Sequence, residues 1–173
     1  MNYMTEDEDV LIDSNILVYA YDNDEKEKNP IAKNLIAKIL SGEMEIYLST
    51  QNLSEFYYNA TIKIKQPLKE SEAKEIVSGI VTLSNVKIVK INGNTILKAI
   101  NISSEYNVSY WDALIAAVMK ENNIQTIITE NEKDFKKIPW LNVFNPFTKN
   151  KNNGFGIAKG SKPLEKEDVE HEL

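Results

Sequence analysis

Residues 10–17 read VLIDSNIL, and this stretch decides the fold. Its first three residues are apolar without interruption, which is typical of a short β-strand buried on both faces. Asp13 follows the run, and the Ser-Asn pair after it leads into apolar residues with helical periodicity. We therefore expect a buried strand that ends at Asp13 and is followed at once by a helix.

The alternation of strand and helix continues to about residue 145. Short apolar or alternating runs predict further strands at 45–49, 86–91, 126–129 and 141–144. Apolar residues at helical spacing predict further helices at 30–40, 53–64, 70–84, 94–107 and 111–123. Strands that alternate with helices of this length pair in parallel through right-handed crossovers. The sequence thus predicts an α/β sandwich with helices on both faces of a parallel sheet.

Length and composition favour one domain. The chain has 173 residues, of which 42% are hydrophobic, enough for one well-buried core and few for two. From about residue 148 the sequence becomes polar and rich in Lys, Asn, Gly and Glu, with too few large apolar side chains for a core of its own. We expect a domain over residues 1–147 and a flexible polar tail over residues 148–173.

The residue types present exclude several classes of site. The chain has no Cys, which removes disulfides, thiolate metal sites and cysteine nucleophiles. Its single histidine, His171, lies in the polar tail, so a Ser-His-Asp mechanism or a histidine-rich metal site is not expected. Any metal site must therefore be built from oxygen ligands.

Charge limits how the chain can meet nucleic acid. The net charge is −6 and the pI is about 5.0, so the surface as a whole does not attract phosphate. All 20 basic residues are lysines, which meet phosphate as mobile point charges. The N-terminal residues MNYMTEDED are acidic where a signal peptide is basic, and no apolar run approaches the roughly 20 residues of a membrane helix. We expect a cytoplasmic protein without membrane contact whose contacts with nucleic acid are local.

Carboxylates stand at comparable places in the alternation of strands and helices. They are Asp13, Glu55, Asp112 and Asp134. In an open parallel sheet, the carboxyl ends of the strands and the helix starts that follow them border one crevice. Carboxylates gathered there repel one another unless a cation neutralises them, and an all-oxygen set favours Mg²⁺ or Mn²⁺. The sequence predicts a metal centre that activates water for phosphodiester hydrolysis.

Each acid also has an ordinary structural explanation. A carboxylate near a helix start is stabilised by capping and by the helix dipole, which is the commoner role of a residue such as Glu55, Asp112 or Asp134 taken alone. Asp13 lies between two buried segments, where an unpaired charge is costly. The functional interpretation is therefore strongest for Asp13.

Four segments in this order resemble the PIN-domain family, and within it the VapC-like toxin ribonucleases of toxin–antitoxin pairs. The segments are LIDSNILVYAYD, LSEFYYNA, YWDALIAAVMKENN and IITENEKDF, within residues 10 to about 145. The resemblance implies a PIN-like three-layer sandwich with a five-stranded parallel sheet. It also implies a Mg²⁺- or Mn²⁺-dependent endoribonuclease with an RNA substrate, a possible antitoxin partner and a homodimer.

Carried over residue by residue, the resemblance assigns roles to the matching positions. Asp13, Glu55, Asp112 and Asp134 match the catalytic, metal-binding acids, and Asn15, Thr129 and Asn131 match positions in or beside the site. Asn15 and Thr129 stand where polar residues support the metal site. Asn131 stands where some members have the fourth acid, with Asp134 three residues later as the substitute.

Other residues and functions remain as alternatives. Lys63, Lys65 and Lys69 could contact RNA, although a solvated face explains any such group. Trp111 and Tyr110 could stack on a base, although core or dimer packing is the more usual role of such aromatic side chains. A catalytically weak binding module with the same fold is the alternative function. A phosphohydrolase with an aspartate nucleophile is a third, although its usual second acid is replaced here by asparagine.

Overall fold

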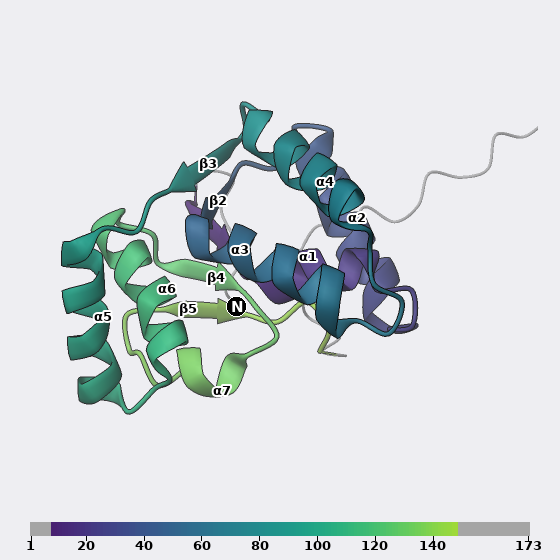
Figure 1. Cartoon of the computed structure of the whole chain (residues 1–173). Coiled ribbons are helices and arrows are strands. Elements are labelled where there is room, and N and C mark those ends of the chain that lie inside the picture. The colour runs from purple at the N-terminus through teal and green to yellow at the C-terminus, as the bar shows by residue number, and fades with distance from the viewer. Residues whose placement is uncertain (1–7, 149–173) are drawn as a thin grey trace, which may run out of the picture.

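A five-stranded parallel sheet forms the middle layer of the protein, which we describe from a computed structural model over residues 8–148. The strand order is β3-β2-β1-β4-β5, and neighbouring strands pair in parallel throughout (Figure 1). The strands are β1 (Val10–Ile12), β2 (Ile46–Ser49), β3 (Val86–Val89), β4 (Thr126–Ile128) and β5 (Asn142–Phe144). The first strand of the sequence is therefore the central strand, with β2 and β4 on either side of it.

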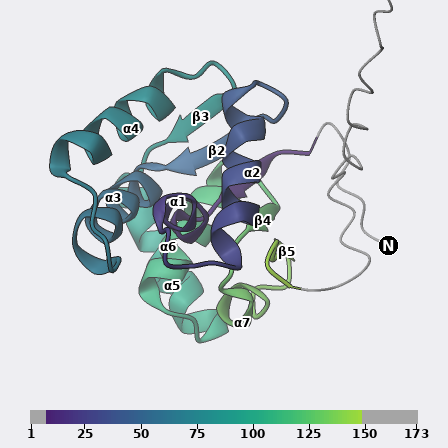
Figure 2. The same ribbon diagram turned by 90° about the vertical axis from the view of Figure 1, so that its right-hand side faces the viewer.

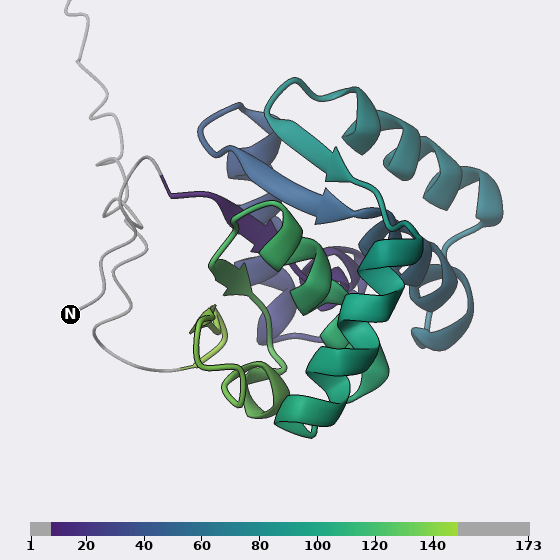
Figure 3. The ribbon, with the colours of Figure 1, turned by 90° about the vertical axis from the view of Figure 1, so that its left-hand side faces the viewer.

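Helices occupy the segments between the strands. They are α1 (Ser14–Tyr21), α2 (Lys28–Leu40), α3 (Thr50–Tyr58), α4 (Glu70–Thr82), α5 (Gly93–Tyr106), α6 (Tyr110–Glu121) and α7 (Glu132–Phe135). A π-helix, η1 (Asn59–Lys63), continues directly from α3. Figures 2 and 3 show two groups of helices, with α5 and α6 in front in Figure 3.

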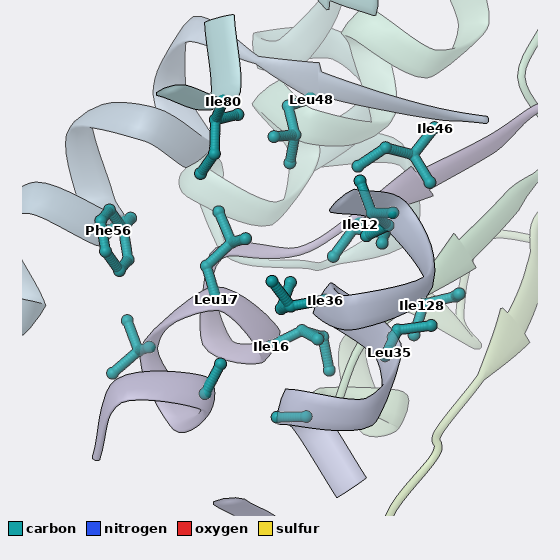
Figure 4. Packing of buried hydrophobic residues seen from close by; sticks show 14 of the residues in the cluster. Ile12, Ile16, Leu17, Leu35, Ile36, Ile46, Leu48, Phe56, Ile80 and Ile128 are labelled. Atoms are coloured by element: carbon teal, nitrogen blue, oxygen red, sulfur yellow. The ribbon is translucent and has the colours of Figure 1, made fainter. Parts of the chain in front are cut away.

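The alternating side chains of the strands divide the core between the two faces of the sheet. Val10 and Ile12 of β1 pack on the face covered by α1 to α4, and Figure 4 shows Ile12 among the side chains of that cluster. Leu11, between them, packs on the other face with residues of α5 and α6. All three β1 residues are at most 2% exposed, which explains why the strand appears in the sequence as a continuous apolar run.

The fold class expected from the sequence is confirmed, and each predicted strand is present. Two features were not predicted. The first is α7, whose four residues are too few to show helical periodicity. The second is η1, where the segment expected to continue as an α-helix widens into a π-helix. The predicted tail from residue 148 lies almost entirely outside the described residues, and no described helix is long and apolar enough to cross a membrane.

The topology brings together the segments that carry the predicted site. Asp13 follows β1, α3 begins directly after β2, and Thr129 follows β4. Because these three strands are neighbours and parallel, their carboxyl ends lie along one edge of the sheet. Helix α1 follows β1 and helix α3 follows β2, so the N-termini of both helices lie at the same edge.

Candidate metal centre

Asp13 lies at the centre of the candidate site and is 6% exposed. It is the N-cap of α1, and its Oδ1 accepts hydrogen bonds from the backbone N–H of Ser14 at 2.7 Å and from the Ser14 hydroxyl at 3.3 Å. Its Oδ2 accepts from the amide of Asn15 at 2.7 Å and from the hydroxyl of Thr129 at 2.6 Å. Both carboxylate oxygens are thus held in place by donors from β1–α1 and from the end of β4.

The surroundings of Asp13 disfavour its charge. The pKa of its carboxyl is raised from 3.8 to about 6, mainly by burial and in part by repulsion from the nearby Glu55 and Asp112. The hydrogen bonds from Thr129 and Ser14 act in the opposite direction by stabilising the anion. The site therefore concentrates negative charge where water does not solvate it well.

Glu55 lies in α3, which a capping box starts at the end of β2. The Ser49 hydroxyl accepts from the N–H of Asn52, and the Asn52 side chain accepts from the N–H of Ser49, so two otherwise unpaired donors are satisfied. One turn further along, Glu55 accepts hydrogen bonds from the Ser14 hydroxyl and from the Gln51 amide, each at 2.7 Å. These bonds fix Glu55 beside Asp13.

Asp112 lies in the first turn of α6. The N-cap Ser109 accepts from the backbone N–H of Asp112 at 3.2 Å and donates its hydroxyl to the Asp112 carboxylate at 2.7 Å. The Asn131 amide donates to the same carboxylate oxygen at 3.2 Å. Burial raises the pKa of Asp112, and repulsion from Asp134 and Glu55 adds to the shift. Asp112 therefore belongs to the same electrostatic cluster as the other acids.

Asp134, in α7, differs from the other acids because it has a cation. Its carboxylate forms an ion pair with Lys137 at 2.7 Å, and this hydrogen bond is the main cause that lowers its pKa. Asn131, which donates to Asp112, also lowers the pKa of Asp134 through a hydrogen bond. Asn131 thus links the two acids, while Lys137 competes with any other cation for the carboxylate of Asp134.

The predicted supporting residues form a chain of hydrogen bonds around Asp13. The Asn15 amide donates to Thr129 at 3.1 Å as well as to Asp13, and the Thr129 hydroxyl donates to Asp13. The backbone N–H of Asn131 donates to the Thr129 hydroxyl at 2.9 Å. This chain joins the end of β1 to the segment after β4.

The distribution of lysines separates the site from other acids nearby. Within residues 8–148, no lysine forms an ion pair with Asp13, Glu55 or Asp112. By contrast, Glu130 pairs with Lys28 at 2.6 Å, although it stands beside the site in sequence. Of these three acids, Glu55 and Asp112 both raise the pKa of Asp13 by repulsion.

The carboxylates are not arranged as a finished coordination shell. In the part of the chain that the structure describes, no three acidic or histidine side chains are close enough to hold a metal ion as they stand. Hydrogen-bond donors occupy the carboxylates of Asp13, Glu55 and Asp112, and Lys137 occupies that of Asp134. Metal coordination would require these side chains to move closer together.

Sequence reasoning missed residues that hold the acids. Ser14 bonds to both Asp13 and Glu55, and its place in the DSN segment was a usable signal. Ser109 lies three residues before Asp112, the spacing of a capping box. Gln51 binds Glu55 and the Trp111 carbonyl, and its Oε1 is buried without a partner among the described residues. Nothing in the local sequence marked Gln51.

A cleft of about 770 Å³ opens beside Glu55. Its lining includes Trp111 and Lys63, which the sequence had left as ambiguous. Trp111 is 62% exposed, so core packing is wrong for it within the described chain while dimer packing stays a prediction, whereas Tyr110 packs against the core of the α5–α6 face. Lys65 and Lys69 are exposed and do not line this cleft.

Comparison with known proteins gives consistent results. The family model for the PIN domain matches residues 10–141. A toxin–antitoxin complex from Klebsiella pneumoniae matches with a TM-score of 0.56 and 23% identity, over 79% of this chain and 97% of that chain. The VapBC2 complex from Rickettsia felis, bound to a DNA fragment from its promoter, has the same TM-score and identity, over 79% and 98%.

A further solved structure is VapC20 from Mycobacterium tuberculosis, described as a toxin that cleaves the sarcin-ricin loop. It matches with a TM-score of 0.54 and 18% identity, over 68% of this chain and 86% of that chain. At these identities the solved structures show a common fold. A comparison with curated proteins gave no match.

Proposed function

Because the chain belongs to the PIN domain family over residues 10–141, we propose that it is a metal-dependent endoribonuclease that hydrolyses phosphodiester bonds in RNA. The observation that carries the proposal is the buried carboxylate of Asp13, which is placed near Glu55 and Asp112 without a lysine partner for any of them among the described residues. A protein gains nothing in stability from such repulsion. A bound cation resolves it.

The donor set fits a hard divalent ion. Asp13, Glu55 and Asp112 would hold Mg²⁺ or Mn²⁺, with Asp134 as the fourth acid. When bound, such an ion polarises a phosphoryl oxygen and lowers the pKa of a coordinated water. Asn131 and Asp134 compete for the fourth position, and we assign it to Asp134 because only a carboxylate adds charge to the set.

The residues around the acids orient them. Thr129 and Asn15 hold one oxygen of Asp13, and Ser14 holds the other while also binding Glu55. Such partners fix the direction of a ligand and typically change metal affinity or activity by about 10- to 100-fold when lost. Within the described residues, the chain therefore supplies carboxylates held in position for a metal ion, rather than a nucleophile or a histidine base.

A second candidate is a PIN-like module that binds RNA or protein with little catalysis. The observation in its favour is that no three of the described acids stand within metal-binding distance of one another. An aspartate-nucleophile phosphohydrolase is less well supported. Asn15 donates to Asp13 where a second acid would be needed, and both oxygens of Asp13 are occupied by donors.

The direct test is RNA cleavage by the purified full-length chain. We expect cleavage that chelators abolish and that Mg²⁺ or Mn²⁺ restores, and its loss in Asp13→Asn and in Asp112→Asn. Asp9→Asn, an exposed aspartate just before β1, is the matched control and should keep full activity. Cleavage that is unchanged in both site variants would reject the nuclease assignment. Metal binding without cleavage would favour the binding module.

We also propose a biological setting. The solved structures from Klebsiella pneumoniae and Rickettsia felis are complexes of a toxin with its antitoxin, which supports a toxin role for this chain. We further propose that the chain acts in the cytoplasm and as a homodimer. A neighbouring small reading frame whose product co-purifies with the chain and suppresses its nuclease activity would support the role. Sedimentation of the purified chain tests the dimer, and a truncated chain of residues 1–147 tests whether the polar tail is dispensable for cleavage.

A further inference from the structure

The cleft beside Glu55 has a composition that the acidic centre does not explain. Its polar and charged lining includes Glu55, Asn59 and Lys63, and its aromatic lining is Tyr58 and Trp111. The cleft runs along one side of α3 and η1 and ends against the start of α6. It therefore joins the predicted metal centre to a surface that carries aromatic rings and a cation.

Trp111 is held in place by its backbone while its ring faces outward. Its carbonyl accepts a hydrogen bond from the Gln51 amide at 3.1 Å, and Asp112 follows it directly in α6. Trp111 is 62% exposed, and its ring lies against the Tyr110 ring, with the centroids 5.4 Å apart and the planes at 68°. An exposed indole offers a face on which a base can stack.

Lys63 also lines the cleft. It is the last residue of η1, and its ammonium lies 5.2 Å from the centroid of the Tyr58 ring. Within the described residues it forms no ion pair with a carboxylate. A π-helical turn is wider than an α-helical turn because its hydrogen bonds join residues five apart. It changes the direction of the residues that follow it, and such turns are frequent at functional sites. Lys63 is thus a cation of the cleft that remains available to an anion.

We propose that this cleft binds an unpaired nucleotide of the RNA substrate next to the cleaved bond, with its base stacked on Trp111 and a phosphate at Lys63. The inference rests on the proposed ribonuclease function and adds to it two side chains of this chain that contact the substrate. Aromatic faces bind any base by stacking, and a nearby cation binds the backbone. In a duplex the bases already stack on one another, so no base has a free face that could stack on Trp111.

Lys63 favours an RNA strand as the occupant of this cleft. It lines the same cleft as Glu55, so a strand would place a phosphate near the ammonium of Lys63 and away from the Glu55 carboxylate. An RNA strand brings a phosphate to Lys63 and an uncharged ring to Trp111, and the metal ion of the proposed centre offsets the remaining charge near Glu55.

Tryptophan fluorescence tests the proposal without depending on cleavage. The chain has two tryptophans, so Trp140→Phe leaves Trp111 as the only tryptophan, and excitation that tyrosine does not absorb reports on it alone. We add Asp13→Asn and a chelator, which stop the proposed hydrolysis, and titrate the full-length protein with a single-stranded RNA octamer and with the same octamer in a duplex. We expect strong quenching by the single strand and little by the duplex.

Two substitutions assign the contacts. Stacking on one base is worth about 1–3 kcal/mol, so Trp111→Ala should weaken binding of the single strand by roughly 5- to 150-fold, measured by anisotropy of labelled RNA. Trp111→Phe should restore most of the affinity. Lys63→Met should weaken binding and lower its salt dependence by about one phosphate contact, whereas Lys65→Met, an exposed lysine outside the cleft, should change neither.

The outcomes separate this inference from the proposed function. Metal-dependent RNA cleavage that is unaffected by Trp111→Ala, together with no quenching of Trp111, overturns the nucleotide site and leaves the nuclease in place. Quenching and a loss of affinity in Trp111→Ala support the site even if the wild-type chain never cleaves RNA. Quenching of Trp111 that follows protein concentration without RNA, with a dimer in sedimentation, assigns Trp111 to a subunit contact and overturns the inference.

Discussion

The hydroxyl of Ser14 lies 2.7 Å from the carboxylate of Glu55 and donates a hydrogen bond to it. Ser14 begins α1 after the central strand, and Glu55 lies in α3 after the neighbouring strand. The same hydroxyl lies 3.3 Å from Asp13. One small side chain therefore sets the spacing of two acids that are far apart in sequence.

Removal of this hydroxyl should weaken the metal centre while leaving the fold intact. In Ser14→Ala, Glu55 keeps only its bond from Gln51 and can turn away from Asp13. We expect Mn²⁺ affinity, measured by titration calorimetry, to fall by about 10- to 100-fold. Ser103→Ala removes a hydroxyl of α5 that donates to the backbone carbonyl of Val108, and it is the control. Equal affinity of the Ser14 variant and the control would show that the hydroxyl does not position a ligand.

Asp13→Asn should stabilise the metal-free protein at neutral and alkaline pH. Burial raises the folded-state pKa of Asp13 to about 6, above the ordinary value of 3.8. The folded state thus binds this proton more tightly than the unfolded state, and the resulting stability is complete below about pH 3.8 and lost as the pH rises through about 6. Such a shift corresponds to about 3 kcal/mol at most.

The measurement for this second prediction is urea unfolding with a chelator at pH 4.5 and pH 8. The free energy of unfolding of Asp13→Asn should exceed that of the wild type by about 1–3 kcal/mol at pH 8, and the gain should shrink at pH 4.5. The amide pairs less well than the carboxylate with the surrounding donors, which reduces the gain. Asp9→Asn, at an exposed position, should show no such pH-dependent gain. A variant less stable than the wild type at both pH values would contradict the strain assigned to Asp13.

The sequence predicted the fold well because the deciding signals are local. VLI at 10–12 is apolar without interruption because β1 is central and buried on both faces, so its place in the sheet is visible in its composition. Helix α6 is likewise predicted by an unbroken apolar stretch that follows Asp112. The short α7 was missed because four residues give no periodicity. Its last residue, Phe135, is fully buried and packs the helix onto the core.

The site was predictable only in part because its partners are distant in sequence. That Asp13, Glu55 and Asp112 come near one another follows from the parallel topology. The topology does not predict which of the acids forms an ion pair with a lysine. Lys137 pairs with Asp134 three residues before it, whereas none of the other lysines pairs with a site acid within the described residues. The exposure of Trp111 could also not be predicted from the sequence, because an aromatic residue next to a buried stretch of helix usually packs inward.

Thr129 should set the acidic limit of metal binding. Its hydroxyl donates to Asp13 at 2.6 Å, and this bond lowers the pKa of Asp13 against the effect of burial. Thr129→Val keeps the shape and removes the donor, so the pKa of Asp13 should rise further. A hydrogen bond to a charged group is worth about 1.5–3 kcal/mol, which predicts a rise of about one pH unit or more in the midpoint of Mn²⁺ binding.

The control for Thr129→Val is Thr126→Val, which changes a threonine at the opposite end of the same strand. Its hydroxyl bonds to Glu8 and not to Asp13, so the midpoint of Mn²⁺ binding should stay where it is in the wild type. Calorimetric titrations at several pH values between 5 and 7.5 compare the two variants. A shared shift in both would mean that general loosening of β4, and not the donor to Asp13, controls the midpoint.

The last prediction concerns the fourth acid. Asp134 pairs with Lys137, whereas Asn131 donates to Asp112. If Asp134 is a metal ligand, Lys137 competes with the metal for its carboxylate, so Lys137→Met should strengthen Mn²⁺ affinity a few-fold and Asp134→Asn should weaken it. The loss in Asp134→Asn should be smaller than in Asp112→Asn, because Asp134 must first leave its lysine.

Lys136→Met is the matched control, since Lys136 pairs with Glu132 on the same short helix and not with a site acid. Its removal changes the net charge equally, so any effect of charge alone appears in both lysine variants. If Asn131 fills the fourth position, the opposite pattern follows: Lys137→Met behaves like the control and Asn131→Ala weakens Mn²⁺ binding more than Asp134→Asn. Because an amide oxygen adds no charge, a centre completed by Asn131 would also hold the metal ion less tightly than one completed by a carboxylate.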